Sequence, residues 1–408
     1  NKVEQNSDTP SLDQKENVSE ISREEALNQS DRINFENESI VGSISLKGGV
    51  IDDLTFKQYN VSLDSQEKVT LLSPRNSKDG YLIESGFITS DKNVEIPNSS
   101  SIWKVSGNNK LTDQSPIKIS WTNDQGITFE KEIALDDKYL FSIKQSVINP
   151  TDKKYDFYTY GQIIRNEMPD ISNFYILHEG LVATLDDELI EEDYDDIQEK
   201  KFSRTAQKGW LGIGDKYWVT SLIPPREKEF KTTFDYKDKF RANFVSTEPL
   251  ELNENSLIEE TLQIIVAAKR VDVIDGYAES LNIDKFDLTI DWGFLYFITK
   301  PLFFGIDYFF KLLGNYGLAI IAITICIRLA FFPLANFSFR SMAKMKALQP
   351  EMARLKELHK DDKMKLQQAM MALYKKEKVN PMSGCLPILV QIPVFFALYK
   401  VLFVTIEM

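Results

Sequence analysis

The sequence is poor in the residues that build metal centres and covalent cross-links. Its 408 residues include only two cysteines, Cys326 and Cys385, and two histidines, His178 and His359. Two cysteines exclude a disulfide framework and a cysteine-rich zinc cluster, and two histidines exclude a multi-histidine metal site. Both cysteines lie in apolar runs, which predicts buried, unreactive thiols. We therefore expect no metal or other cofactor.

The usual sequence signatures of enzymes are also missing. The chain has no glycine-rich phosphate loop, no Gly-x-Ser-x-Gly motif, no His-Glu-x-x-His motif and no internal repeat. A formal net charge of −13 argues against nucleic acid as a partner of this chain. The prediction is a protein that is not an enzyme and does not read nucleic acid.

Charge is distributed very unevenly along the chain. Residues 1–292 carry 33 Lys and Arg against 54 Asp and Glu, a net charge of −21, whereas residues 293–408 carry 15 against 7, a net charge of +8. An asymmetry of this size predicts different surroundings for the two parts.

Alternating apolar and polar residues dominate from residue 33 to residue 290. In the segment 127–133, for example, apolar residues and Lys131 alternate with Thr128, Glu130 and Glu132, and clusters of turn-forming residues flank it. This period-two pattern predicts antiparallel strands, and its length predicts a large β-sandwich domain over 33–290. Residues 1–32 are polar and acidic, which predicts a disordered linker.

The character of the chain changes at residue 292. Residues 292–313 are almost entirely apolar and rich in aromatic side chains, and their polar exceptions Lys300, Asp307 and Lys311 share one helical stripe. A helix with a narrow charged stripe and a broad aromatic face suits a membrane interface. We expect an interfacial amphipathic helix here, with a buried core helix as the alternative.

Two longer apolar segments predict membrane spans. Residues 316–337 would form a helix of about 33 Å, enough to cross a hydrocarbon core of ~30 Å, and 386–406 is a second candidate. Residues 340–378 between them carry 11 Lys and Arg against 5 Asp and Glu. A short basic loop is retained in the cytoplasm, so the large acidic domain is expected outside. The fold class predicted is therefore an α+β membrane protein.

The basic loop itself predicts a cytoplasmic helical hairpin over 340–379. Apolar residues recur there every three or four positions, Pro350 should kink or divide the first helix, and Asp361 and Asp362 could begin the second. Flexible methionine side chains suit adaptable contact surfaces, although they could equally pack the hairpin against itself. The candidate contact residues are Met342, Met345, Met352, Met370 and Met371.

A run of short motifs resembles one family over the last part of the chain. The motifs are Ser-Met-Ala-Lys-Met at 341–345, Leu-Gln-Pro at 348–350, Asp-Asp-Lys at 361–363, Met-Met-Ala-Leu-Tyr at 370–374, Val-Asn-Pro at 379–381, Gly-Cys at 384–385, Pro387 and Gln-Ile-Pro at 391–393. With these motifs the region resembles the YidC/Oxa/Albino family of membrane protein insertases, and the β-rich part is more weakly similar to the large periplasmic β-supersandwich domain of its Gram-negative members.

The resemblance implies a location and a site. It implies a multi-pass protein of the bacterial inner membrane with its large domain in the periplasm. Six spans are expected in such members, of which this chain would lack the first and the last three. The hydrophilic substrate groove of the family implies a groove arginine at Arg328, a groove-facing threonine at Thr324 and, less directly, a polar lining residue at Gln391.

Physical chemistry supports Arg328 independently. It is the one charge in the predicted span 316–337 and lies 12 residues into it, about 18 Å along the helix. Arginine at the centre of a membrane helix costs about 2.5–3.5 kcal/mol on insertion scales, so it usually faces a water-filled cavity or a partner. The alternative is that Arg328 extends to the inner headgroups, helped by a helix that ends early at Pro333.

The resemblance also implies function and partners. The expected activity is insertion and folding of nascent inner-membrane proteins, alone or with the Sec translocon, with the lipid bilayer and possible ribosome contacts as further partners. Two other functions remain open from sequence. One is a membrane-anchored, sugar-binding or epimerase-like periplasmic protein, for which His178 and Glu179 would be the acid–base candidates. The other is a channel or transporter that uses Arg328.

Overall fold

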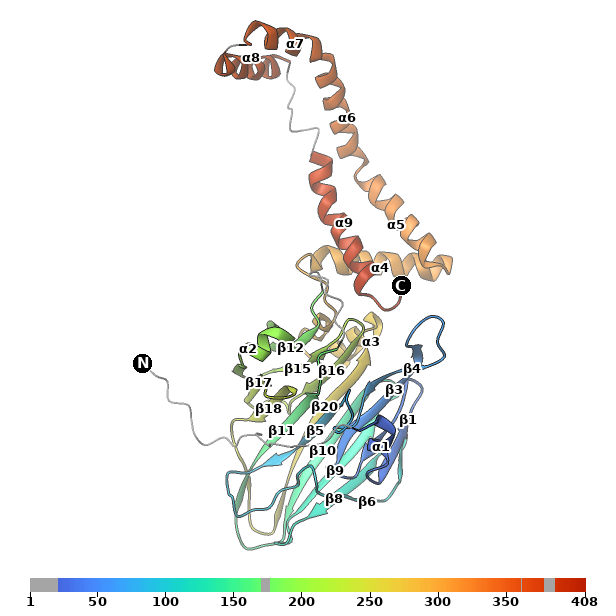
Figure 1. The fold of residues 1–408 in the computed structure, drawn as a ribbon, viewed down its shortest axis with the longest axis vertical. Helices are drawn as coiled ribbons and strands as arrows, with labels where there is room; N and C mark the ends of the chain where they lie inside the picture. The colour runs from blue at the N-terminus through green and yellow to red at the C-terminus, as the bar shows by residue number, and fades with distance from the viewer. Residues whose placement is uncertain (1–20, 170–176, 361, 378–385) are drawn as a thin grey trace, which may run out of the picture. The chain divides into compact units, whose positions relative to one another are not determined.

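The computed structural model describes residues 21–169, 177–360, 362–377 and 386–408. The chain divides into two units, Asn1–Asp291 and Trp292–Met408 (Figure 1). The division falls where the sequence changes from alternating to continuously apolar. Each unit is described by itself below.

The first unit is a β-sandwich of two large sheets. The 11-stranded sheet has the order β14-β17-β18-β11-β5-β3-β2-β1-β7, with β19 paired to β11 and β4 to β3. The 9-stranded sheet has the order β13-β12-β15-β16-β20-β10-β9-β8-β6. Almost all described pairings are antiparallel, with β1 and β7 as a parallel pair. The predicted large antiparallel β-sandwich is therefore confirmed.

The strands of the 11-stranded sheet are β1 (Arg32–Glu36), β2 (Ile40–Ser45), β3 (Val50–Asn60), β4 (Lys68–Leu72), β5 (Tyr81–Ile88), β7 (Lys110–Leu111), β11 (Tyr155–Arg165), β14 (Phe202–Ala206), β17 (Phe230–Tyr236), β18 (Phe240–Ser246) and β19 (Leu250–Leu252). Those of the 9-stranded sheet are β6 (Lys104–Ser106), β8 (Ile117–Thr122), β9 (Thr128–Leu135), β10 (Leu140–Asn149), β12 (Gly180–Leu185), β13 (Glu188–Asp193), β15 (Gly209–Gly214), β16 (Trp218–Ile223) and β20 (Ser256–Ala268). The short helices of this unit are α1 (Arg23–Leu27), α2 (Tyr194–Glu199), α3 (Val271–Ser280) and the 3₁₀ turn η1 (Phe286–Thr289).

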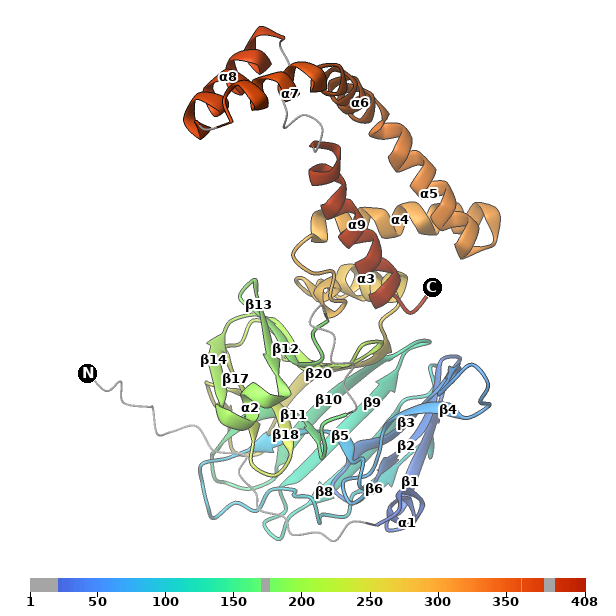
Figure 2. The same ribbon diagram turned by 45° about the horizontal axis from the view of Figure 1, so that its top comes forward.

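The alternating sequence pattern becomes alternating burial. Along β9, Phe129, Lys131, Ile133 and Leu135 are buried, while the intervening residues are half-buried or exposed. The neighbouring strand β10 pairs with β9 on one side and with β20 on the other, and Figure 2 shows these strands running side by side. Period-two patterning therefore builds the interior of the sandwich, with one charged residue, Lys131, among its apolar side chains.

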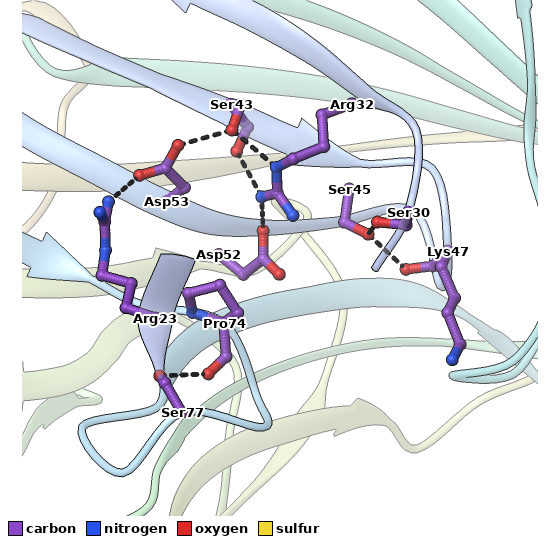
Figure 3. A network of polar contacts seen from close by, with 10 residues as sticks. All are labelled: Arg23, Ser30, Arg32, Ser43, Ser45, Lys47, Asp52, Asp53, Pro74 and Ser77. Carbon is purple, nitrogen blue, oxygen red and sulfur yellow. Dashed lines mark hydrogen bonds and ion pairs between the residues drawn. The ribbon is translucent and has the colours of Figure 1, made fainter. Parts of the chain in front are cut away.

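The disordered linker expected through residue 32 ends earlier than predicted. Ser22 caps the short helix α1, and Ser22 and Glu25 form a reciprocal capping box. Arg23 of α1 forms an ion pair with Asp53 on β3, and Ala26 is buried (Figure 3). The prediction was wrong for this segment because composition does not reveal a cap and an anchor that need a distant strand. The part of the expected linker at 1–20 lies outside the described residues.

A polar network holds this edge of the sandwich together (Figure 3). Arg32 on β1 donates to Ser43 Oγ at 2.7 Å and pairs with Asp52 on β3, and Ser43 Oγ donates to Asp53 Oδ2 at 2.5 Å. Burial raises the pKa of Asp52, and the Arg32 guanidinium opposes that shift. Two arginines facing two carboxylates therefore tie β1, β2 and β3 to α1.

The 11-stranded sheet has a seam between β3 and β5. These neighbouring strands share one paired position, Ile51 with Ile83, whereas β5 pairs with β11 over eight consecutive positions from Tyr81 to Ile88. Next to the seam, Arg75 and Glu84 form an ion pair. Ser73, directly after β4, also forms an isolated backbone bridge with Tyr81 at the start of β5, so backbone pairing across this part of the sheet is short.

The second unit consists of helices: α4 (Tyr296–Leu313), α5 (Tyr316–Ala330), α6 (Phe332–Ala347), α7 (Gln349–Leu358), α8 (Lys363–Lys376) and α9 (Leu386–Val404). Within it, α4 contacts α5 and α9, α6 contacts α9, and α7 contacts α8. Among the residues that the structure describes, α9 is the one helix long and apolar enough to cross a bilayer, and α5 with α6 adds a second candidate if that bent pair is one span. These facts are compatible with the predicted spans, which remain predictions.

The single helix expected over 316–337 is divided. α5 ends at Ala330, α6 begins at Phe332, and the two are bent by 57° at the break. Pro333 stands in the first turn of α6. Proline cannot donate the backbone hydrogen bond that a continuous helix would need here, and its ring crowds the preceding turn. From the sequence, an early helix end at Pro333 was expected only if Arg328 extends to the inner headgroups.

The basic region begins its second helix as the sequence predicts. The Asp362 side chain accepts from the Lys365 backbone N–H at 3.0 Å and caps α8. Pro350 lies in the first turn of α7, so the first predicted helix is split into α6 and α7. The other expected capping residue, Asp361, and the end of the predicted hairpin at 378–379 lie outside the described residues.

Candidate functional site

Two of the three predicted groove residues meet across two helices. Arg328, in the last turn of α5, donates from Nη1 to Oε1 of Gln391 in α9 at 3.4 Å. Arg328 is exposed and Gln391 is half-buried. Sequence alone gave Gln391 the weaker case, and the structure brings it to the predicted groove arginine.

The contact with Gln391 does not neutralise the positive charge of Arg328. Gln391 is neutral, so it orients the guanidinium without compensating its charge. The carbonyl end of α5, beside Arg328, carries partial negative charge and favours a cation in the last turn. α5 itself contains no acidic residue. The arrangement presents an oriented cation on a helix that carries no other charged residue.

Thr324 lies one turn before Arg328 on the same helix. Its Oγ1 donates to the Ile320 carbonyl at 2.7 Å, and its side chain is half-buried. A hydroxyl that donates within its own helix keeps its oxygen lone pairs available as acceptors. A spacing of four residues places Thr324 and Arg328 on one face of α5, and their lining of a common groove remains a prediction.

A further polar residue of this unit escaped the sequence analysis. Ser338 on α6 is only 2% exposed, although many apolar side chains of α5, α6 and α9 are exposed. α6 contacts α9, the helix that carries Gln391. The signal in the sequence was a small polar residue within a run of large apolar ones, a pattern that periodicity does not distinguish from a tolerated surface serine.

The predicted contact methionines fall into two groups. Met342 and Met371 are exposed, whereas Met345, Met352 and Met370 are half-buried. The Tyr374 hydroxyl donates to Met352 Sδ at 3.9 Å and links α8 to α7. Met352 therefore packs α7 against α8, and the contact role of the exposed methionines remains a prediction. Met364, 72% exposed on α8, is a further exposed methionine that sequence analysis did not single out.

The predicted buried thiols are only partly testable. Cys326 on α5 is exposed, contrary to the prediction, because an apolar run in a membrane helix signals contact with lipid as readily as burial in protein. Cys385 lies outside the described residues. No group of His, Cys, Asp and Glu suited to a metal ion is found among the residues that the structure describes.

The residues considered for epimerase-like chemistry have structural partners instead. His178 Nδ1 lies 3.0 Å from Asp193 Oδ1 and Nε2 lies 3.3 Å from the Leu181 carbonyl oxygen, so both ring nitrogens are engaged. Glu179 Oε1 accepts from the Lys216 backbone N–H at 2.9 Å. Both neighbours of the ring are acceptors, so a neutral imidazole donates to one of them at a time, and these contacts fasten the start of β12.

Comparison with known proteins gives matches over both units. A family model described as the YidC periplasmic domain matches residues 32–304, and one described as the 60Kd inner membrane protein matches residues 308–408. The membrane protein insertase YidC of Pelagibacter ubique is 74% identical over 408 residues, which are 100% of this chain and 73% of that protein. That of Brucella melitensis is 42% identical over 397 residues, 95% of this chain and 65% of that protein.

Solved structures give weaker likenesses. An active YidC insertase crystal structure with the first transmembrane domain resolved matches with a TM-score of 0.31 and 16% identity, over 92% of this chain and 72% of that chain. A galactose mutarotase related enzyme from Lactobacillus acidophilus matches with a TM-score of 0.42 and 12% identity, over 58% of this chain and 98% of that chain. Scores at this level carry no argument, and the assignment depends on sequence.

Both family models and the sequence identities agree with the motifs of the helical unit. The chain spans about two thirds to three quarters of the length of the curated relatives named above. The chain belongs to the YidC family of membrane protein insertases, proteins of the bacterial inner membrane with a large periplasmic domain, which is the β-sandwich unit here.

Proposed function

We propose that Arg328, Thr324 and Gln391 line a hydrophilic groove through which this protein inserts nascent membrane proteins without chemical catalysis. The observation that carries the proposal is the contact between Arg328 on α5 and Gln391 on α9. Two polar groups from separate apolar helices approach each other, which is expected where helices border water rather than lipid. Membership of the insertase family supports the activity, and this contact supports Arg328 and Gln391 as parts of one polar surface.

The groove acts by shortening the apolar distance that a polar segment must cross. A hydrated cavity open to the cytoplasm lets the flanking residues of a substrate helix stay solvated during most of their passage. Arg328 attracts acidic residues in the translocated tail, because attraction between unit charges grows as the effective permittivity falls below that of water. The apolar substrate helix then leaves sideways, driven by burial of its surface in lipid.

The same proposal assigns places to the other helices. α9 and the bent pair α5–α6 cross the membrane, and α4 lies in its outer interface with Phe297, Tyr308 and Leu312 exposed. α7 and α8 form a cytoplasmic hairpin that meets the substrate or the ribosome first, and α8 carries four lysines. Positive charge in this region supports the cytoplasmic placement. The β domain is the part available to components of the Sec translocon.

The test is an insertion assay with the full-length protein in proteoliposomes. Substrates carry a translocated tail that is either acidic or neutral and is otherwise identical. Arg328→Ala should lower the insertion of acidic-tail substrates and spare neutral ones, and Arg328→Lys should retain much of the activity because it keeps the charge. Equal losses for both tails would remove the electrostatic role of Arg328.

A further inference from the structure

The helix α4 joins the two helices that carry the predicted groove residues. α5 and α9 each pack on α4 (Figure 2), and no comparable packing joins α5 to α9 among the residues that the structure describes. Beyond Arg328 along the chain, α6 also contacts α9. In the part of α5 that precedes Arg328, the spacing between α5 and α9 therefore depends on how closely each of them approaches α4.

Apolar burial fixes α4 on α9. The buried residues of α4 recur with the spacing i, i+4, i+7 and so lie on one face of the helix. They are Thr299, Phe303 and Ile306. The buried residues of α9 have the same spacing and are Ala397, Val401 and Val404. Two buried faces of matching period on helices that contact each other indicate that these faces pack together.

A glycine brings α4 close to α5. Gly305 lies in the interior of α4, where glycine destabilises a helix by about 1 kcal/mol relative to alanine. A Cβ atom at this position would lie 2.9 Å from Cδ1 and 3.6 Å from Cγ1 of Ile323 on α5. By contrast, a Cβ atom at Gly276 in the helix α3 would have nothing within 4 Å. The glycine at 305 is therefore explained by the close approach of two helices, which small residues permit between membrane helices.

The contact at Ile323 lies near Arg328 on the same helix. Ile323 precedes Arg328 by five residues, about 7.5 Å along the axis, and α5 is continuous over this stretch. A displacement of α5 at Ile323 is therefore carried to Arg328. The hydrogen bond from Arg328 to Gln391 is 3.4 Å long, near the upper limit for such a bond, so a small increase in the spacing of α5 and α9 breaks it.

We infer that Gly305 is a positioning residue for insertion. By admitting Ile323 close to the backbone of α4, it sets the spacing of α5 and α9 at which Gln391 orients Arg328. α4 thus holds the two helices at a fixed separation, besides its proposed place in the membrane interface. The role in insertion rests on the proposed function of Arg328, whereas the spacing is a property of the helices and can be measured separately.

The experiment measures this spacing in the full-length protein in proteoliposomes. Spin labels are attached to Cys326 on α5 and to Leu389→Cys on α9, which are exposed positions, in a version without other cysteines. Gly305→Leu should shift the distance between the labels by about 2 Å, since interaxial distances of packed helices vary over that range with the side chains at the contact. Ile323→Ala makes room for the added side chain, so the double variant should return to the wild-type distance.

A matched control and a milder variant lie on the same helix. Phe297 is 70% exposed on α4, so Phe297→Leu should leave the distance between the labels unchanged. Gly305→Ala should give a smaller shift than Gly305→Leu, because Ile323 Cδ1 is the end of a flexible side chain, and adding Ile323→Val, which removes that atom, should abolish the shift. An unchanged distance in the Gly305 variants, or a shift that the Ile323 substitutions do not reverse, would overturn the inference.

The insertion assay with acidic and neutral tails separates this inference from the proposed function. Gly305→Leu should lower the insertion of acidic-tail substrates about two- to threefold more than that of neutral ones, as for one weak hydrogen bond, and Ile323→Ala should restore the ratio. If the distance behaves as expected but wild-type protein does not distinguish the tails, the electrostatic role of Arg328 is wrong and the spacing role of Gly305 stands. If wild-type protein distinguishes them and Gly305→Leu shifts the distance without changing the ratio, Gly305 does not position Arg328.

Discussion

Arg328 and Gln391 lie 63 positions apart in the sequence, and their side chains are joined by a hydrogen bond of 3.4 Å between α5 and α9. This length is near the upper limit for a hydrogen bond, so the contact is weak. A carboxylate of a substrate tail would form a shorter, charge-assisted bond with the same guanidinium. Gln391 therefore orients Arg328 and is readily displaced from it by a carboxylate.

The first prediction follows from that exchange. Gln391→Glu would place a permanent carboxylate beside Arg328 and should compete with acidic substrate tails. We expect insertion of acidic-tail substrates to fall by roughly fivefold, about 1 kcal/mol, while neutral tails are spared. Gln391→Leu, which removes the contact and adds no charge, is the control and should have a smaller effect. If both variants behaved alike in the insertion assay, competition by charge would be wrong.

The second prediction concerns topology. In a version of the full-length protein without its native cysteines, Lys92→Cys in the β domain should react with an impermeant thiol reagent added to cells with a permeabilised outer membrane. Lys356→Cys on α7 should react only after the inner membrane is opened. Both positions are exposed, so access to the reagent depends on their compartment. Labelling of Lys356→Cys from outside would contradict the assignment of the basic region to the cytoplasm.

The third prediction tests the interfacial placement of α4. Phe297 and Phe304 are 70% and 48% exposed, and the Asp307–Lys311 ion pair at 2.7 Å follows along the helix. Phe297→Asp or Phe304→Asp should reduce stable membrane seating because a charge replaces an apolar side chain in the lipid boundary. Lys311→Gln, on an exposed side chain of the same helix, should matter little. Carbonate extraction of membranes measures the difference, and equal extraction of all variants would argue for a helix outside the interface.

The fourth prediction is a pH dependence of stability set by Lys131. Burial lowers its folded-state pKa from 10.5 to about 7, so between those pH values the unfolded chain binds a proton that the folded chain does not. The free energy of unfolding should therefore rise with pH over that window, by at most about 1.4 kcal/mol per pH unit from this residue.

Lys131→Met provides the comparison for this dependence. Buried Lys269, with a pKa lowered to about 8, contributes a slope of the same sign and remains in both proteins. Thermal unfolding of the β domain, followed by tryptophan fluorescence from pH 7 to pH 9, should show a steeper rise in the wild type than in Lys131→Met. Parallel curves would mean that Lys131 is protonated in the folded state throughout.

Local patterning predicted the elements that depend on nearby residues. The strands around Phe129, the cap at Asp362 and the division of a helix at Pro350 follow from neighbouring residues, and the structure has all three. The docking of α1 and the break at Phe331 were harder. The docking of α1 depends on an ion pair with Asp53, which lies on a distant strand. At Pro333 the sequence permits either a bent helix or the end of one helix and the start of another, and the structure has the second.

The candidate site also separates into residues that local sequence can identify and residues that need the tertiary structure. Arg328 could be identified because one charge in an apolar helix is conspicuous on its own. Gln391 acquires its place only when α5 and α9 are brought together, and Ser338 becomes notable only when its burial is known. The burial of Lys131 against the Trp103 ring was not predicted, because the two residues lie on separate elements and each is unremarkable in its own strand or loop.

The single paired position between β3 and β5 also bears on how the β domain opens. The 9-stranded sheet has continuous ladders, with ten consecutive pairs between β10 and β20. The 11-stranded sheet has one paired position between β3 and β5, Ile51 with Ile83, and an isolated bridge between Ser73 and Tyr81 beside it. Cooperative opening follows the weakest boundary, so β1, β2, β3 and α1 should exchange their amide hydrogens as one group before β10 and β20 do. The domain thus has a built-in line along which its first strands can separate while its spine stays folded.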